Sequence, residues 1–373
     1  MNSHPLLRSA AVALALALAC VGAQAQTPTG HMGASVAHYA GGLNNPRGLE
    51  FGPDGAMYVA EGGTGGSHST VGRCRQVAPP IGPYMGSLTG GSVSRIQRGT
   101  GGQTSVHRLT TNIPSSTTSA DSGSLVSGAA DVAFIGNELY VLVAGGGCSH
   151  GTTRNNVILR MSLPSGAVTP VANLSAYILA NPGSVVEDDF EPDGTWYSMV
   201  AYNGALYVVE PNQGLFIRVN PTTGAITRLL DFGTALGTHV VPTALARNNG
   251  RFYISNLGTF PITDGTERVW RVLSNPTRLQ AVAVGTTILG LAFDPRDDAM
   301  YLLQMTSGAA EPTPGLGSIV RIRPGGGPQT IVTGLSLPTA LTLGPDGALY
   351  VSNFGFGPPI PGVGEILRVT LPH

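Results

Sequence analysis

One phrase recurs six times along the 373 residues of this chain. Each copy has an apolar stretch, a short turn rich in Gly, Asp or Asn, a strand that contains Tyr, and a later apolar strand that carries Arg. The six pairs are Tyr58 and Arg95, Tyr140 and Arg160, Tyr207 and Arg218, Tyr253 and Arg271, Tyr301 and Arg321, and Tyr350 and Arg368. A unit of this size cannot bury its own apolar face, so the copies must pack against one another as an array.

Each copy divides into short strands. The innermost strands are expected at 46–52, 129–135, 196–202, 242–248, 288–294 and 338–344. Gly, Asn and Asp in the turns that follow supply the positive φ that tight hairpins need. With 53 Gly, 28 Pro and only 11% charged residues, the composition is that of many short strands joined by tight turns. The sequence therefore predicts an all-β, six-bladed β-propeller with four antiparallel strands per blade.

The last copy lacks its outer strand, because only four residues follow the third strand at 364–369. Near the other end of the chain, the segment 35–46 mirrors the outer strand and loop at 330–338. We expect Val36–Tyr39 to supply the outer strand of the sixth blade, which closes the ring and removes an exposed sheet edge. Residues 26–373 then form one domain.

The repeated tyrosines and arginines are assigned a structural role, because they recur at equivalent positions of every blade. We expect Tyr to pack between blades, and Arg to lay its stem along apolar surface with its head bonded to the backbone.

The first residues form an export signal. Arg8 precedes the apolar run Ala10–Val21, and Ala23-Gln24-Ala25 is a small-residue cleavage site. This pattern predicts a signal peptide over 1–25, cleavage after Ala25, and a secreted or periplasmic protein. The alternative is a lipoprotein anchored at Cys20. The apolar run is too short for a membrane span, and nothing downstream resembles a transmembrane segment.

Cleavage would leave two cysteines, Cys74 and Cys148, in loops that follow the same strand of adjacent blades. In an oxidising compartment a disulfide between them is the expected outcome. A zinc site that adds His68 and His150 is the alternative, although the ligand spacing is irregular.

The long connections all lie on one face of the predicted disc. Strand direction alternates, so the short turns share one face, which we call the short-turn face, and the long loops share the other, the long-loop face. The long loops are 62–90, 110–128, 144–155, 174–195, 257–267, 305–316 and 354–363. Because loops on a rigid scaffold commonly carry binding sites, we expect a small-molecule, glycan or protein ligand on this face. With 20 Lys and Arg against 21 Asp and Glu, the chain has no excess positive charge to bind nucleic acid. We also expect a monomer.

A ring of equivalent positions directly follows the Tyr strands, and five of its six members bear oxygen. These positions are Glu61, Val143, Glu210, Asn256, Gln304 and Asn353. In one interpretation each side chain caps its own loop. In the other, several converge at the mouth of the central channel and bind a polar ligand or a hard cation. The candidate ligand-binding residues are Arg47, Glu61, Glu210, Asn256, Gln304 and Asn353, and the candidate Ca²⁺ ligands are Glu61, Glu210, Asn256 and Asn353.

The segment 187–193 packs five carboxylates into seven residues on the long-loop face. It lacks the spacing of a calcium-binding loop. We interpret it as a solvated acidic loop, with a weak Ca²⁺ site or recognition of a cationic ligand as the alternative.

Three segments, 42–66, 240–272 and 337–357, resemble the ScyD/ScyE family of secreted bacterial β-propellers, which is related to NHL-repeat proteins. The most specific likeness is the loop 256–261 followed by Gly265, whereas 191–198 departs from the family pattern. The resemblance covers nearly all of the chain after residue 25. It implies an exported propeller and no established catalytic activity.

Two functions follow from these observations, and a purely structural surface protein, which would show no concave pocket on the long-loop face, is a third. The first is an exported binding or accessory protein that recognises a ligand on the long-loop face. The alternative is a Ca²⁺-dependent hydrolase or lyase of the gluconolactonase or strictosidine-synthase-like type, which needs several oxygen ligands converging on one cation. No G-x-S-x-G, H-E-x-x-H or C-x-x-C motif is present, so no catalytic residue is assigned.

Overall fold

The computed structural model describes residues 26–185, 187, 190–274 and 277–372, and within them it is a six-bladed β-propeller. The predicted signal peptide, including Cys20, lies outside the described residues. The inner strands, one per blade, are β3 (Pro46–Phe51), β8 (Ala129–Ile135), β12 (Ser198–Tyr202), β16 (Pro242–Asn248), β20 (Ile288–Phe293) and β24 (Ala340–Leu343). All six lie within the predicted segments.

Three further antiparallel strands complete each blade. The second strands are β4 (Met57–Glu61), β9 (Glu138–Val143), β13 (Ala205–Glu210), β17 (Arg251–Asn256), β21 (Met300–Gln304) and β25 (Leu349–Asn353). The third strands are β5 (Met85–Arg98), β10 (Val157–Ser162), β14 (Leu215–Val219), β18 (Glu267–Leu273), β22 (Gly317–Ile322) and β26 (Gly364–Thr370). The outer strands are β6 (Thr104–Thr117), β11 (Ala167–Asn173), β15 (Ile226–Asp231), β19 (Arg278–Gly285), β23 (Pro328–Leu335) and β2 (Ser35–Leu43).

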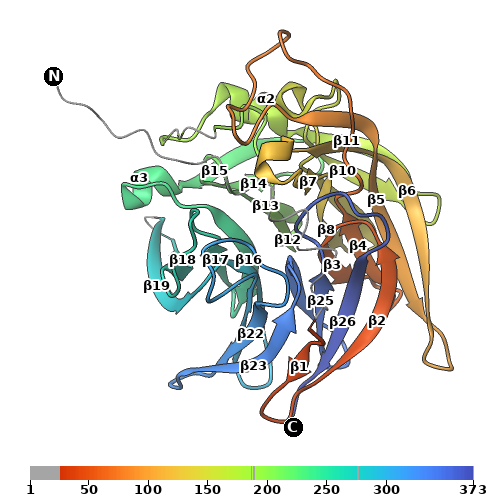
Figure 1. Ribbon diagram of the computed structural model, residues 1–373, viewed down its shortest axis with the longest axis vertical. Helices are drawn as coiled ribbons and strands as arrows, with labels where there is room; N and C mark the ends of the chain where they lie inside the picture. Colours follow the sequence, from red (N-terminus) through yellow and green to blue (C-terminus); the bar gives the residue numbers. More distant parts are fainter. Residues whose placement is uncertain (1–25, 186, 188–189, 275–276, 373) are drawn as a thin grey trace.

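The ring closes through β2, which pairs antiparallel with β26 and places Val36 opposite Val369. Figure 1 shows this junction, where β2 near the N-terminal end of the described chain lies beside β26 near the C-terminus. The predicted closure is therefore confirmed. An additional short strand, β1 (Thr29–Gly30), pairs with β23 of the preceding blade and ties the same segment to a second sheet.

Several segments expected to be loops are ordered elements. β5 and β6 are each 14 residues long and form a hairpin that extends well past the predicted third strand at 91–96. The two-residue strand β7 (Val126–Ser127) pairs with the end of β6. Helices α2 (Leu174–Ala180) and α3 (Phe232–Leu236) begin at Asn173 and Asp231, whose side chains accept backbone N–H groups of the first turn. Two short 3₁₀ helices, η1 (Ala120–Ser122) and η2 (Cys148–His150), lie in the loops.

The repeated Tyr and Arg face each other across neighbouring strands in all six blades, as in the pairs Tyr58 with Arg95 and Tyr350 with Arg368. Tyr58, Tyr140, Tyr301 and Tyr350 are buried between blades, as expected. The arginine heads, however, bond to side chains. Arg321 donates to Gln329 Oε1 at 2.9 Å, and Arg95 and Arg368 pair with carboxylates of the short turns. The expectation of backbone bonds was wrong for these three arginines, because a polar side chain lies beside each of them.

Candidate functional site

The inner strands of all six blades enclose a central cavity of about 320 Å³. Each inner strand runs from the long-loop face toward a short turn, so its first residues line one mouth of the channel and its last residues line the other. We call these ends the long-loop mouth and the short-turn mouth. Arg47 and Tyr197 belong to the first mouth, and Arg247 belongs to the second.

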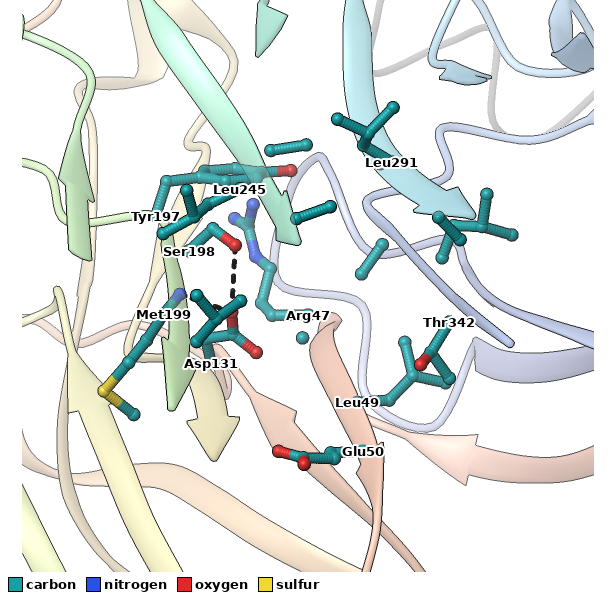
Figure 2. A pocket seen from close by; sticks show the side chains of 18 of the residues that line it. Arg47, Leu49, Glu50, Asp131, Tyr197, Ser198, Met199, Leu245, Leu291 and Thr342 are labelled. Carbon is teal, nitrogen blue, oxygen red and sulfur yellow. Dashed lines mark hydrogen bonds between the residues drawn. The ribbon is translucent and has the colours of Figure 1, made fainter. Parts of the chain in front are cut away.

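The middle of the channel is apolar. Six aliphatic residues occupy equivalent positions, because each lies opposite the residue that follows a repeat tyrosine on the second strand. They are Leu49, Val132, Met199, Leu245, Leu291 and Leu341, and all six line the cavity. This ring, which we call the aliphatic ring, separates the polar groups of the two mouths; Figure 2 shows Leu49, Met199, Leu245 and Leu291 from it.

Arg47 reaches into the channel from the start of β3 toward Tyr197 (Figure 2). It donates to the backbone carbonyl of Val126 and hydrogen-bonds to the Tyr197 side chain, whose hydroxyl donates to the Thr339 carbonyl at 2.7 Å. Burial lowers the pKa of Arg47, and the neighbouring Tyr197 only partly offsets this. Among the described residues no carboxylate lies within 4.0 Å of the Arg47 guanidinium. The long-loop mouth therefore contains a half-buried cation without a carboxylate partner among the described residues.

Asp131 lies below this cation on β8 and is only 8% exposed. Its carboxylate accepts the backbone N–H groups of Val132 at 2.8 Å and Met199 at 2.7 Å, and the Ser198 hydroxyl at 3.1 Å. Burial raises the pKa of Asp131 to about 7 and outweighs these three bonds, which favour the ionised form. The Asp131 side chain thus has a pKa near neutrality.

Glu50, on β3, is the second carboxyl group of the channel. Burial raises the pKa of Glu50 to about 8, the negative charge of Asp131 adds to the shift, and the N–H of Phe134, 3.2 Å from Oε2, opposes it. Two neighbouring carboxyl groups with pKa values near neutrality can donate a proton to a bound molecule or accept one from it.

The predicted ring residues do not line this cavity. Glu61 is fully buried, pairs with Arg108 at 3.0 Å and accepts the N–H of Asn44 at 2.6 Å. Glu210 accepts the backbone N–H groups of Thr195 and Gln213 at 2.8 and 2.7 Å, and burial raises its pKa to about 7. Both carboxyl groups therefore hold the loops of their own blades.

The amides of the ring behave in the same way. Asn256 Oδ1 accepts the Arg268 N–H at 2.8 Å, Gln304 Oε1 accepts the Thr286 N–H at 2.9 Å, and Asn353 Oδ1 accepts the Ser336 N–H at 2.8 Å. Of the six residues predicted to bind a ligand, only Arg47 lines the cavity.

The predicted convergence of calcium ligands is not found. Glu61, Glu210, Asn256 and Asn353 bond to separate loops, and the part of the chain that the structure describes holds no group of three or more His, Cys, Asp or Glu that could bind a metal ion. The donor set therefore does not fit a cation at the channel mouth. The capping interpretation describes these residues better, because their oxygens are already occupied by backbone donors.

The acidic segment is also different from the expectation. Glu187 is exposed, and 188–189 lie outside the described residues, but Glu191 and Asp193 are buried. Asp193 Oδ2 accepts the N–H and hydroxyl of Ser149 at 2.9 and 2.7 Å, and Glu191 accepts from the hydroxyl of Thr195. The interpretation as a solvated loop was wrong for Glu191 and Asp193, because both are buried and hydrogen-bond to residues of the long loops.

The predicted disulfide between Cys74 and Cys148 is present, with the two Cα atoms 6.3 Å apart. It excludes these cysteines as zinc ligands. His68 Nδ1 lies 2.7 Å from the Gly151 carbonyl, and the fully buried His150 lies 3.0 Å from the Ser116 hydroxyl and 3.5 Å from Glu191. Both histidines are therefore parts of the loop network.

Sequence reasoning missed Tyr197, Asp131 and Glu50. A signal was present, since a carboxylate inside the apolar phrases 129–135 and 46–52 breaks the pattern of the other inner strands. A carboxyl group buried within an apolar strand marks either a defect or a site.

Comparison with known proteins shows the class of fold. No protein-family model matches the sequence, and no curated protein matches it. The PQQ domain of pyranose dehydrogenase from Coprinopsis cinerea is similar with a TM-score of 0.55 and 10% identity, covering 92% of this chain and 97% of that one. The PQQ-bound aldose sugar dehydrogenase from Streptomyces coelicolor is similar with a TM-score of 0.51 and 14% identity, and the match covers 91% of this chain and 99% of that one. A structure titled as a putative gluconolactonase is similar with a TM-score of 0.50 and 14% identity, and the match covers 92% of this chain and 96% of that one. The chain is thus a six-bladed β-propeller protein.

Proposed function

We propose that this propeller is an exported binding protein that holds a small molecule with an anionic group at the long-loop mouth of its channel. The observation that carries the proposal is the Arg47 guanidinium, which lines the cavity and has no carboxylate within 4.0 Å among the described residues. An anionic ligand would supply the missing counterion, and Tyr197 would position its polar atoms.

Export is supported by the Cys74–Cys148 disulfide, because such bonds persist in oxidising, extracytoplasmic compartments. Signal-peptide cleavage after Ala25 and membership of the ScyD/ScyE family are part of the same proposal, as is a monomeric state. In the described residues no helix combines the length and the hydropathy that a membrane crossing requires.

The second candidate function is a hydrolase or lyase. The carboxyl pair Asp131 and Glu50 supports an enzyme that transfers protons without calcium. Their pKa values of about 7 and about 8 suit proton transfer at neutral pH. The calcium-dependent form has less support, since its four expected ligands are bound to separate loops.

The experiment is a ligand screen on the protein that begins at residue 26. Small carboxylates, phosphate esters and neutral sugars are tested by thermal shift, and hits are measured by calorimetry. Arg47→Gln should weaken the anionic hits roughly tenfold or more. Tyr197→Phe, which keeps the ring, should weaken them less.

Arg73→Gln is the matched control, because Arg73 is an exposed arginine of the long-loop face. It removes the same charge and should leave binding unchanged. The proposal would be overturned if every hit is uncharged, or if every anionic hit binds Arg47→Gln as tightly as it binds the unmodified protein. Chemical conversion of a hit that is abolished by Glu50→Gln would instead establish the enzymatic candidate.

A further inference from the structure

The opposite end of the channel contains a second arginine in an unusual setting. Arg247 lies one residue before the end of β16 and lines the central cavity at the short-turn mouth. Its guanidinium carbon is 3.4 Å from the centroid of the Tyr202 ring and 5.9 Å from that of Phe252. The stacking fixes the plane of the guanidinium and desolvates its faces.

The edge of this guanidinium lacks protein acceptors. Across the described residues the Arg247 side chain forms neither an ion pair nor a hydrogen bond, and its Nε is buried without a partner. Two arginines of short turns or their neighbouring strands bond to carboxylates: Arg296 bonds to Asp294 at 2.6 Å, and Arg95 bonds to Asp54 at 2.8 Å. Arg271 and Arg321 also have a buried Nε without a partner, but their Nη2 groups donate to Gln280 and Gln329. Arg247 therefore combines a fixed geometry with Nη donors that no acceptor in the described part of the chain uses, which is the condition of a receptor group and not of a structural ion pair.

We propose that Arg247 forms a second anion-binding site of the propeller, specific for a small organic carboxylate. Stacking on Tyr202 leaves the N–H groups pointing outward in the guanidinium plane, and a carboxylate matches this planar fork with two parallel bonds. A spherical anion such as chloride has a single acceptor atom and cannot accept two parallel bonds from the guanidinium. The apolar neighbours Phe293 and Leu343, which line the same mouth of the cavity, would contact the rest of the molecule.

The site is independent of the one proposed around Arg47. By strand register Arg47 is equivalent to Thr243, because Pro46 and Pro242 lie opposite the matching residues Glu61 and Asn256. Arg247 is four residues further along its strand, or about 13 Å toward the other face. The aliphatic ring lies between the two levels, so one small anion cannot contact both arginines.

Nuclear magnetic resonance of protein labelled with ¹⁵N-arginine tests the site directly. The Nε–H resonance of Arg247 is assigned by its loss in Arg247→Gln. Benzoate and acetate, titrated at constant ionic strength, should shift this resonance with saturation. Arg247→Gln should weaken benzoate binding measured by calorimetry roughly tenfold, and Arg247→Lys should remove the preference for carboxylate over chloride.

Controls separate this site from the first and from a folding defect. Arg251→Gln removes an exposed arginine from the neighbouring strand β17 and should leave benzoate affinity unchanged. Arg47→Gln should also leave the Arg247 shift unchanged, so failure of either site can be recognised separately. A shift that grows linearly with concentration, or an equal response to chloride, would overturn the proposal. If Arg247→Gln unfolds, Arg247→Lys assigns the resonance instead, and the same two outcomes in the unmodified protein still decide the proposal.

Discussion

Gly48 lies directly against the carboxylate of Asp131 in the next blade. A Cβ atom on Gly48 would stand 1.8 Å from Asp131 Oδ1 and 2.8 Å from its Cα. Because a backbone atom is also involved, rotation of the Asp131 side chain cannot relieve the clash. The absence of a side chain at 48 is therefore what allows a carboxyl group to enter the channel wall.

Gly48→Ala should lower the free energy of unfolding by about 2 kcal/mol or more, because inner strands of neighbouring blades would have to move apart. Urea unfolding followed by fluorescence measures this change. Gly327→Ala is the control, since nothing lies within 4 Å of its Cβ position. Equal stability of the two variants would mean that the blades are not packed as described.

Because the pKa of Glu50 is raised in the folded protein, we expect the free energy of unfolding to fall as pH rises. Burial raises the pKa of Glu50 to about 8, so the folded protein holds this proton more tightly than the unfolded chain does. Stability is then full below the ordinary glutamate pKa and declines as pH rises toward about 8, above which it levels off. Glu50→Gln keeps an acceptor for the Phe134 N–H and removes the titration.

The melting temperature of Glu50→Gln should therefore exceed that of the unmodified protein at about pH 9, and the difference should shrink toward about pH 5. Thermal melts across this range measure it. Glu187→Gln, at an exposed glutamate, should follow the unmodified protein at every pH. A constant offset between Glu50→Gln and the unmodified protein would show that Glu50 does not titrate with folding.

Much of the scaffold could be predicted because its signals are local and repeated. The turns and the Tyr and Arg positions locate every blade, and strand register places each Tyr opposite its Arg. The extension of β5 and β6 could not be foreseen, because Ser, Thr and Gly resemble a loop until the two segments pair with each other. The burial of Glu191 depends on partners such as Tyr84, more than a hundred residues away. Channel contacts likewise join different blades, and no local pattern encodes them.

The Cys74–Cys148 disulfide should contribute strongly to stability, because it closes a segment with a sequence separation of 74. Loop closure of this length is worth about 4 kcal/mol of unfolding free energy in the chain-entropy description. Reduction, or the double substitution Cys74→Ser and Cys148→Ser, should shift the urea midpoint accordingly. A reducing agent should leave the double variant unaffected, and an unchanged midpoint on reduction of the unmodified protein would contradict the expectation.

Asp54 joins the repeated Tyr and Arg of the first blade at a single oxygen. Its Oδ2 accepts the Tyr58 hydroxyl at 3.0 Å and Arg95 Nη2 at 2.8 Å. In the blade closed by β2, Asp346 Oδ2 accepts from Tyr350 at 3.0 Å and from Arg368 Nη2 at 2.7 Å. Both aspartates come from the same Pro-Asp-Gly-Ala turn, so the turn sequence and the Tyr–Arg pair act together.

Asp54→Asn should lower the free energy of unfolding by about 0.5–1 kcal/mol, since the pair is partly exposed and screened by solvent. Burial raises the pKa of Asp54, but the bonds from Arg95, Ala56 and Tyr58 outweigh this and bring it below the ordinary value. The contribution is therefore complete above the ordinary aspartate pKa and is lost as pH falls through the lower, folded-state pKa. Urea unfolding at neutral and acidic pH tests this sign, with Asp121→Asn, at an exposed aspartate, as the control. A difference between Asp54→Asn and the unmodified protein that persists undiminished in acid would show that the charge of Asp54 is not what stabilises the turn.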